Sequence, residues 1–453
     1  MLLSLFFYVE FCRHKIEQAT IQPAQLAFLD AIEPFSTATI RLEQLSAEIN
    51  TVAWLHLAKL YAKENADIAY QLAQYYLLEK QTNAAVLWYQ TAIRKQHVAA
   101  HIALANYYYI NQRYSDIVPL LLPVKDHDDA LILLYKVALQ LGNIDFIFQH
   151  QEKFANIEQV DFYQELKSFS VFDANNIAPS KQCDIDVQLF ATNLEGLRHA
   201  QQLINQFQHH QLSRFMCLYT PKYIPKKALN CLHSSHEKIS CKASVWEGRQ
   251  DISSRYLGVI VERGGANVDN GIMYLDQQDD INVLAHELAH FVGFIDEYPL
   301  PAQHQKCQQH QQQTFSHNIV TIAKHYHGDR LSIRESILSQ LPWGTLIKPT
   351  TPILTKINSG WQLITPAEFQ NELGVFPAKT CERNANVQAF KPYYARTQLE
   401  YFELALPTAY IDILALKTNQ FLMPSYHYNV SQDLAKQGEY QRAMEVLRTA
   451  LFD

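Results

Sequence analysis

Residues 279–298 read DDINVLAHELAHFVGFIDEY, and this stretch predicts a short helix with two histidines on one side. Apolar side chains recur at the i, i+3, i+4 and i+7 spacing of an amphipathic helix, at Ile281, Leu284, Ala285, Leu288, Ala289 and Val292. Asp279 or Asp280 can cap its first turn. At about 100° per residue, His286 and His290 lie roughly 140 to 180° around the helix from Ile281. The helix is therefore expected to bury one face and to present both imidazoles on the other.

The spacing of the two histidines suits a shared metal ion. Residues at i and i+4 of a helix lie about 6 Å apart along its axis, so both rings can converge on one Zn²⁺ at about 2.0–2.1 Å. Glu287 lies beside such a site, where it can take a proton from a water molecule. Two other interpretations remain for the bare HExxH pattern: hydrogen-bonded histidines in a metal-free helix, or an inactive, degenerate peptidase.

Two further residues make the pattern more specific. Gly293 can adopt a positive φ, which would end the helix and turn the chain back beneath the metal. Asp296 then arrives as a third ligand that offers an oxygen atom, and Glu297 is the alternative third ligand. This layout resembles that of the metzincin peptidases, HExxHxxGxxH, with aspartate in place of the third histidine.

The run at 286–298, HExxHxxGxxDEY, resembles the IgA-type metallopeptidase family of bacteria. The resemblance implies a zinc-dependent endopeptidase. It implies three zinc ligands and a general base, namely His286, His290 and Asp296 as ligands and Glu287 as the base. By the same resemblance, Glu297 and Tyr298 support the ligands or the local structure.

Other segments match the family pattern more loosely. Residues 271–276, GIMYLD, suit the edge strand along which such peptidases bind an extended substrate by strand addition. Three later segments stand where similar proteases carry a Trp segment, a Gly-aromatic turn and an aromatic-basic-Pro motif: LPWGTLI at 341–347, GVF at 374–376 and AFKP at 389–392.

A metzincin also has a methionine turn below its zinc ion. Met423, in FLMPSYH, is the candidate for this turn, and Leu399 is the alternative. Tyr426 follows closely enough to be a candidate hydrogen-bond donor to the transition state. The histidines at 304–317, HQKCQQHQQQTFSH, are expected to form a solvated polar loop that Cys307 ties down.

The N-terminal part of the chain predicts stacked helices. Ala, Leu and Tyr recur at helical spacing in three echoes, LAKLY at 57–61, LAQYY at 72–76 and LANYY at 104–108, the last two 104 − 72 = 32 residues apart. Residues 83–95 supply a helix between them. This part resembles a degenerate array of tetratricopeptide or Sel-one-like repeats, which implies a face for a protein partner. An ordinary helical bundle with no binding role is the alternative.

The composition changes to loop-forming Asn, Pro and Ser around 165–185. We therefore expect an α+β protein with an all-α, solenoid-like helical-repeat domain at 15–170. A metzincin-like α/β zinc peptidase domain is expected at 180–428 and a C-terminal helical hairpin at 429–453.

Charge and cysteine content bear on partners and location. The net charge of −7 gives no basic surface for nucleic acid. The apolar N-terminus, MLLSLFFYVEFCRHK, is too short to span a membrane, and it can be a secretory signal, a buried first helix or a misassigned start. The six cysteines after Cys12 fit either three disulfides or free buried thiols. The cell envelope or secretion is therefore favoured over the cytoplasm.

These patterns together predict a zinc endopeptidase that cleaves a protein or peptide substrate, with Glu287 as general base and the N-terminal repeats docking a partner or the substrate. The alternative is a non-catalytic helical-repeat binding protein that carries a degenerate or structural zinc domain. A fourth protein ligand such as His304 would indicate a structural site, because a catalytic zinc keeps one position open.

Overall fold

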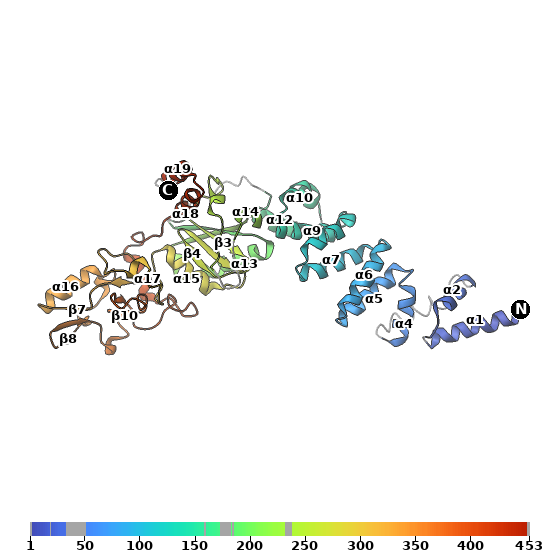
Figure 1. The fold of residues 1–453 in the computed structure, drawn as a ribbon, viewed down its shortest axis with the longest axis horizontal. Helices are drawn as coiled ribbons and strands as arrows, with labels where there is room; N and C mark the ends of the chain where they lie inside the picture. Colours follow the sequence, from blue (N-terminus) through green and yellow to red (C-terminus); the bar gives the residue numbers. More distant parts are fainter. Residues whose placement is uncertain are drawn as a thin grey trace. The chain divides into compact units, whose positions relative to one another are not determined.

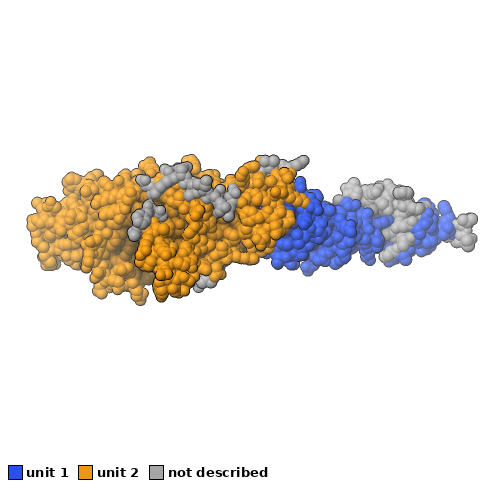
Figure 2. All heavy atoms as spheres, turned by 90° about the horizontal axis from the view of Figure 1, so that it is seen from above, with its two compact units in different colours: residues 1–138 blue, residues 139–453 orange. Residues whose placement is uncertain are grey.

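The computed structural model describes residues 2–18, 20–32, 51–157, 160–172, 183, 185–231 and 238–450. The chain mixes helix and sheet, with the helices mostly in its N-terminal part, which agrees with the expected α+β class (Figure 1). It divides into two compact units, residues 1–138 and 139–453, coloured separately in Figure 2. Residues 173–182 and 184 of the predicted boundary segment lie outside the described residues. Within the described part, no helix is both long and apolar enough to cross a membrane.

The first unit is built from helices. They are α1 (Leu2–Glu17), α2 (Pro23–Ile32), α4 (Val52–Tyr61), α5 (Ala66–Leu78), α6 (Thr82–Arg94), α7 (Val98–Ile110), α8 (Tyr114–Leu121), η1 (Leu122–Val124) and most of α9 (Asp128–Leu141). From α4 to α8, each helix contacts the next one along the chain. Helices α5 to α8 begin at 66, 82, 98 and 114, so a new helix starts every 16 residues. The 32-residue spacing in the sequence therefore corresponds to two helices.

The sequence echoes mark buried positions of these helices. In the last two echoes, LAQYY and LANYY, the buried residues are equivalent: they are Leu72, Ala73 and Tyr76 in α5, and Leu104, Ala105 and Tyr108 in α7. The predicted helix at 83–95 is α6. Small alanines at these positions let neighbouring helices approach closely, which explains why alanine recurs in the pattern.

Three turns between these helices use a left-handed residue that is not glycine. Lys80, Gln96 and Gln112 have φ of 59°, 63° and 58°, and each stands two residues after its helix. A side chain in this conformation is disfavoured, so each turn carries local strain. No glycine marks the ends of these three helices.

Helix α1 is only partly buried. Val9 and Cys12 are buried, whereas five large apolar side chains are exposed, namely Leu5, Phe6, Phe7, Tyr8 and Phe11. A fully buried first helix, one of the three interpretations of this segment, is therefore not observed.

The second unit is organised by a five-stranded sheet of order β2-β1-β3-β5-β4. Its strands are β1 (Asp186–Ala191), β2 (Cys217–Tyr223), β3 (Tyr256–Val261), β4 (Asn267–Asp269) and β5 (Ile272–Asp276). Four are parallel, and β4 pairs with β5 in the antiparallel sense. Every residue of β1 and β3 is buried, as expected for parallel strands covered on both faces.

The prediction that 271–276 forms the edge strand is wrong. This segment is β5, which has β3 on one side and β4 on the other, so the edge strand is β4. The pair Asn270-Gly271, with φ of 41° and 83°, reverses the chain between β4 and β5. An Asn-Gly pair is a strong hairpin signal that the sequence offered at this point.

Helices cover both faces of this sheet (Figure 1). Helices α13 (Leu194–Phe207) and α15 (Ile281–Phe291) lie on one side, and the hairpin of α18 (Tyr426–Lys436) and α19 (Tyr440–Thr449) lies on the other. The hairpin core residues Val430, Leu434 and Ala443 join one cluster with Leu257 and Val259 of β3. The C-terminal hairpin therefore forms part of the sheet's core.

The remaining elements are short. The helices are α10 (Ile144–Gln149), α11 (Gln151–Ala155), α12 (Val160–Ser168), α14 (Lys226–Leu229), α16 (Arg330–Gln340), α17 (Thr408–Leu416), η2 (Gln211–Arg214), η3 (Ala243–Trp246), η4 (Gln305–Cys307), η5 (Gly344–Leu346) and η6 (Ala367–Phe369). Two small antiparallel sheets follow the main one, β10 (Phe376–Ala378), β11 (Ala389–Lys391) and β6 (Val320–Thr321), and β7 (His325–Tyr326), β9 (Gly360–Leu363) and β8 (Leu354–Ile357).

All six later cysteines are paired. The disulfides are Cys183–Cys217, Cys231–Cys241 and Cys307–Cys381, and Cys12 is a buried free thiol. The structure therefore favours disulfides over free thiols in the second unit. The third disulfide ties the histidine-containing segment at 304–317 to the strand region near β10, as expected for Cys307.

We predict that Lys80→Gly stabilises the first unit. Lys80 is exposed and left-handed, so glycine removes conformational strain worth about 1 kcal/mol in the free energy of unfolding. The matched control is Lys125→Gly at an exposed residue with φ of −61°, which should cost roughly 0.5–1 kcal/mol. Urea unfolding followed by circular dichroism measures the free energy of unfolding of both variants. Equal destabilisation by the two changes would show that Lys80 is not strained.

Candidate metal centre

Helix α15 is fixed at its start by the predicted cap. The Asp280 carboxylate accepts hydrogen bonds from the backbone N–H of Asn282 at 2.9 Å and of Val283 at 3.1 Å. At the other end, the ring of Phe291 stacks on Tyr256 of β3 with 4.2 Å between centroids. The helix is therefore held against the sheet, and the residues on its other side are directed into a cleft.

Gly293 ends the helix as predicted. Its φ is +87°, and a Cβ at this position would lie 2.5 Å from Phe421. Both the backbone conformation and the close approach therefore require glycine. The chain turns back at this point and carries Asp296 to the two histidines.

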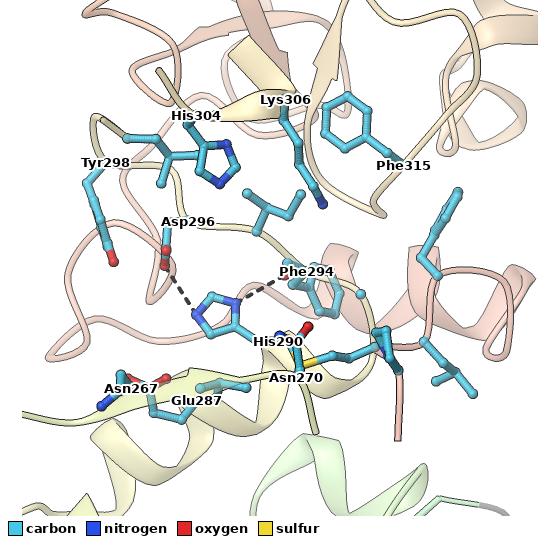
Figure 3. Close-up of a pocket in the computed structure, with 18 of the residues that line it drawn as sticks. Asn267, Asn270, Glu287, His290, Phe294, Asp296, Tyr298, His304, Lys306 and Phe315 are labelled. Atoms are coloured by element: carbon cyan, nitrogen blue, oxygen red, sulfur yellow. Dashed lines mark hydrogen bonds and ion pairs between the residues drawn. The ribbon is translucent and has the colours of Figure 1, made fainter. Parts of the chain in front are cut away.

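Three side chains meet at one point. Asp296 Oδ1 lies 3.2 Å from Nε2 of His286 and 3.2 Å from Nε2 of His290, and Figure 3 shows the second of these contacts. One ligand atom from each residue lies within 4.8 Å of the other two. Ligand atoms about 2.0–2.1 Å from a tetrahedral zinc ion are about 3.3 Å apart, so these separations fit such an ion.

The outer ring nitrogens orient both imidazoles. His286 Nδ1 lies 2.8 Å from the Gln398 carbonyl, and His290 Nδ1 lies 3.1 Å from the Phe294 carbonyl. A carbonyl only accepts hydrogen bonds, so each Nδ1 carries a hydrogen and each ring turns its Nε2 toward Asp296. Asp296 Oδ1 is buried and has no hydrogen-bond partner. Two imidazole nitrogens and a carboxylate oxygen that face one another in this way are suited to bind a shared cation.

Charge coupling in the cluster is strong. Burial opposes ionisation of Asp296, but the neighbouring imidazoles outweigh it and hold the pKa of this carboxyl well below its usual range. Burial lowers the pKa of His290, yet the Asp296 carboxylate reverses this effect and raises that pKa to about 9. The site therefore stabilises positive charge beside Asp296.

Glu287 lies beside the cluster without joining it. It is 7% exposed, lines the cleft and is not among the residues that converge with Asp296. Burial raises the pKa of its carboxyl group. A carboxylate with a raised pKa beside a metal site is suited to accept and return a proton.

Glu297 is directed away from the histidines into the core. Its Oε2 accepts hydrogen bonds from Lys391 Nζ at 2.7 Å and Thr397 Oγ1 at 3.0 Å. Its Oε1 accepts from the Tyr410 hydroxyl at 2.5 Å and Asn318 Nδ2 at 3.3 Å. The structure therefore brings Asp296, and not Glu297, to the two histidines. It also explains the AFKP segment, whose lysine is the ion-pair partner of Glu297.

Tyr298 borders the cleft. Its side chain is 40% exposed and lies beside Asp296 in Figure 3. Burial raises the pKa of its hydroxyl group, and the Asp296 carboxylate raises it further. Tyr298 is therefore a neutral hydrogen-bond donor next to the candidate metal ligands.

The two candidates for a methionine turn both lie near α15. The Met423 N–H donates to the Phe291 carbonyl at 3.0 Å, and Met423 lines the cleft. Leu399 is fully buried, and its carbonyl accepts a hydrogen bond from the Glu297 N–H at 2.8 Å. Tyr426 is buried in the core at the start of α18 and does not line the cleft, so the structure does not bring this predicted donor to the site.

The cleft above the ligands has a volume of about 520 Å³. Edge strand β4 contributes Asn267 and Val268, and the 304–315 segment contributes His304, Lys306 and Phe315 (Figure 3). Apart from His304, these side chains were not predicted from the sequence, because nothing in their local pattern marks them.

The histidines at 304–317 were expected to face solvent, and not all of them do. His310 is exposed, His304 lines the cleft and His317 is 1% exposed. The His317 ring is enclosed by Phe294 and Phe421, with centroids 5.6 Å and 4.8 Å away. Aromatic packing beneath Gly293 therefore overrides the polar local sequence.

Comparison with protein-family models, with curated proteins and with solved structures found no match to this chain.

We predict that the protein loses stability between pH 6.5 and about pH 4 through His317. Burial lowers the pKa of this imidazole to about 4, so in that range the unfolded chain binds a proton that the folded chain does not. The full effect is about 3 kcal/mol, present above pH 6.5 and lost as the pH falls. His317→Leu should flatten the pH dependence of urea unfolding, and His310→Leu should not. An unchanged slope in His317→Leu would contradict the assignment.

We predict that Glu297→Gln destabilises the second unit by about 3 kcal/mol. The change leaves the Lys391 ammonium, 4% exposed, without its closest carboxylate. The exposed Glu403→Gln is the control and should change the free energy of unfolding by less than about 0.5 kcal/mol. Similar unfolding of both variants would show that the buried pair does not anchor the Asp296 segment.

Proposed function

We propose that the second unit is a zinc-dependent endopeptidase of metzincin type. The observation that carries this proposal is the convergence of His286, His290 and Asp296 at the base of a cleft, with Glu287 beside them. No fourth His, Cys, Asp or Glu within the described residues joins this group, and His304 is not part of it. Three protein ligands and an open position are typical of catalytic zinc sites, whereas structural sites are closed by a fourth ligand.

The sheet beside the helix supports a peptide substrate. Strand β4 is the antiparallel edge of the five-stranded sheet, and its residues line the cleft that contains the ligands. The outer edge of such a strand can pair with an extended peptide through main-chain hydrogen bonds. A peptide bound in this way would pass in front of Glu287.

Zinc bound at the three ligands would polarise the substrate carbonyl and lower the pKa of a water molecule at its open position. The chain's own residues prepare the site. The carbonyls of Gln398 and Phe294 hold the two imidazoles in place, and Glu287 accepts the proton of the attacking water and returns it to the leaving amine. Tyr298, beside Asp296, is placed to donate a hydrogen bond to the developing oxyanion.

The first unit is proposed as a docking scaffold of stacked, tetratricopeptide-like helices. A cavity of about 600 Å³ lies along α5 and α7 and is lined by residues such as Tyr70, His97 and Ile102. A stack of this kind offers an extended surface to a protein or to the substrate. The three disulfides support a location outside the cytoplasm, in the cell envelope or secreted.

Metal analysis and casein cleavage test the proposed function. We expect one zinc per chain in the purified protein. His286→Ala should lose both zinc and activity, because it removes a ligand. Glu287→Gln should keep zinc and lose activity by about 10²–10⁴-fold, because it removes only the base.

His310→Ala, at an exposed histidine outside the cluster, is the control and should retain zinc and activity. A wild-type protein that binds no zinc, or a Glu287→Gln variant as active as the wild type, would refute the proposal. Zinc retention without any peptide cleavage would favour the non-catalytic binding protein instead.

A further inference from the structure

A lysine without a carboxylate partner stands in the wall of the cleft. Lys306 lies on η4, is half-buried and lines the same cavity as Glu287 and His290. Its Nζ lies 5.0 Å from the centroid of the Phe315 ring, and in Figure 3 the ammonium group points into the cavity. Within the described residues, no carboxylate forms an ion pair with it. A half-buried charge that lacks a counter-ion favours an anionic ligand.

The charged residues that line the cleft also favour an anionic ligand. The acidic residues that line it are Glu287 and Asp296, and both belong to the proposed catalytic centre. Lys238, which is exposed, provides a second ammonium group along the cleft and also has no carboxylate ion-pair partner among the described residues. Away from the metal ligands, the surface offered to a substrate is therefore basic, although the whole chain carries a net charge of −7.

The surroundings of Lys306 suit a carboxylate on an apolar stem. Phe315, Leu300 and Phe294 line the cavity together with Lys306. Burial lowers the pKa of the Lys306 ammonium, so an incoming anion would stabilise its charged form. Apolar walls around one cation match the methylene groups and terminal carboxylate of a glutamate side chain better than a polar, uncharged residue.

The segment that carries Lys306 is held in place from both sides. Cys307 is bonded to Cys381, and the Cys307 carbonyl accepts a hydrogen bond from Asn384 Nδ2 at 2.7 Å. Cys307 also packs in a small core with Leu300 and Ile319. The ammonium group is therefore presented by an ordered wall, which reduces the entropy lost when it binds a ligand.

We propose that Lys306 forms a subsite for a substrate carboxylate, so that the peptidase selects peptides with a glutamate or aspartate next to the cleaved region. This inference rests on the proposed function and names its substrate class. The chemistry that Lys306 recognises is a carboxylate, which either an acidic side chain or a free peptide C-terminus can supply. The side chain is the source we expect, because β4 can bind a continuous extended segment.

Peptide binding tests the subsite without relying on catalysis. The protein is the full chain with Glu287→Gln, measured with and without added zinc, and the probes are fluorescein-Ala-Ala-Xaa-Ala-Ala peptides with Xaa as Glu, Gln or Lys. Each peptide is made with an amidated and with a free C-terminus. We expect the amidated Glu peptide to bind at least about ten-fold tighter than the Gln peptide in fluorescence anisotropy. Adding Lys306→Met should abolish the difference, and Lys306→Glu should reverse it in favour of the Lys peptide.

Two further variants keep the test interpretable. Lys306→Arg retains the positive charge and should keep the preference, which separates loss of charge from loss of folding. Lys356→Met, at an exposed lysine on β8 outside the cleft, should behave as the parent protein. Equal binding of all the Glu and Gln peptides by the parent protein, whether the C-terminus is amidated or free, would overturn the proposal. Tighter binding of the free than of the amidated C-termini, equal for the Glu and Gln peptides and lost in Lys306→Met, would keep the carboxylate subsite and assign it to the peptide terminus.

Cleavage by the wild-type chain separates this inference from the proposed function. In a peptide library, we expect acidic residues to be enriched at one position near the cleaved bonds and the enrichment to be lost in Lys306→Met. Cleavage without acidic enrichment would support the peptidase function and refute the Lys306 subsite. Selective binding of the Glu peptide without any cleavage would retain the subsite and remove the peptidase.

Discussion

The second unit depends on one constraint: two imidazoles and a carboxylate must be held face to face. Asp296 Oδ1 lies 3.2 Å from both Nε2 atoms and accepts no hydrogen bond, which is costly for a buried oxygen. The surrounding structure maintains this arrangement through the carbonyls of Gln398 and Phe294 and through the turn at Gly293. A cation between the three groups would give the buried Asp296 oxygen a partner, and the proposed chemistry depends on that cation.

The residue next to the ligand anchors it. Glu297 is buried with four hydrogen-bond donors, among them Lys391 and Tyr410, and its own N–H donates to the Leu399 carbonyl. Since Asp296 and Glu297 are adjacent, the ion pair in the core fixes where the ligand carboxylate emerges. The Leu399 carbonyl follows that of Gln398, which orients His286, so one short segment positions both a histidine and the aspartate. Of the two adjacent acidic residues, Asp296 is therefore the candidate metal ligand and Glu297 anchors it in the core.

The sequence predicted the parts of this site that depend on local geometry. Helical spacing placed His286 and His290 on one side, Gly293 marked the helix end, and Asp280 was one of two expected caps. Contacts between distant segments could not be predicted from the sequence. Lys306 and Phe421 line the cleft only because of tertiary packing, and His317 is buried despite its polar neighbours. The edge strand β4 was missed although Asn270-Gly271 signals its hairpin. In the first unit, the sequence did not reveal that a helix begins every 16 residues, because Lys80, Gln96 and Gln112, and not glycines, form the turns between these helices.

Zinc K-edge X-ray absorption of the purified full chain would show which atoms surround a metal bound at His286, His290 and Asp296. We expect one zinc ion with nitrogen and oxygen neighbours at about 2.0–2.1 Å, including two imidazoles and one further light atom from solvent. His304→Ala should leave this spectrum unchanged, whereas Asp296→Ala should alter it. Sulfur neighbours at about 2.3 Å, a shell of imidazoles that includes His304, or a protein that takes up no zinc would contradict a catalytic centre built on His286, His290 and Asp296.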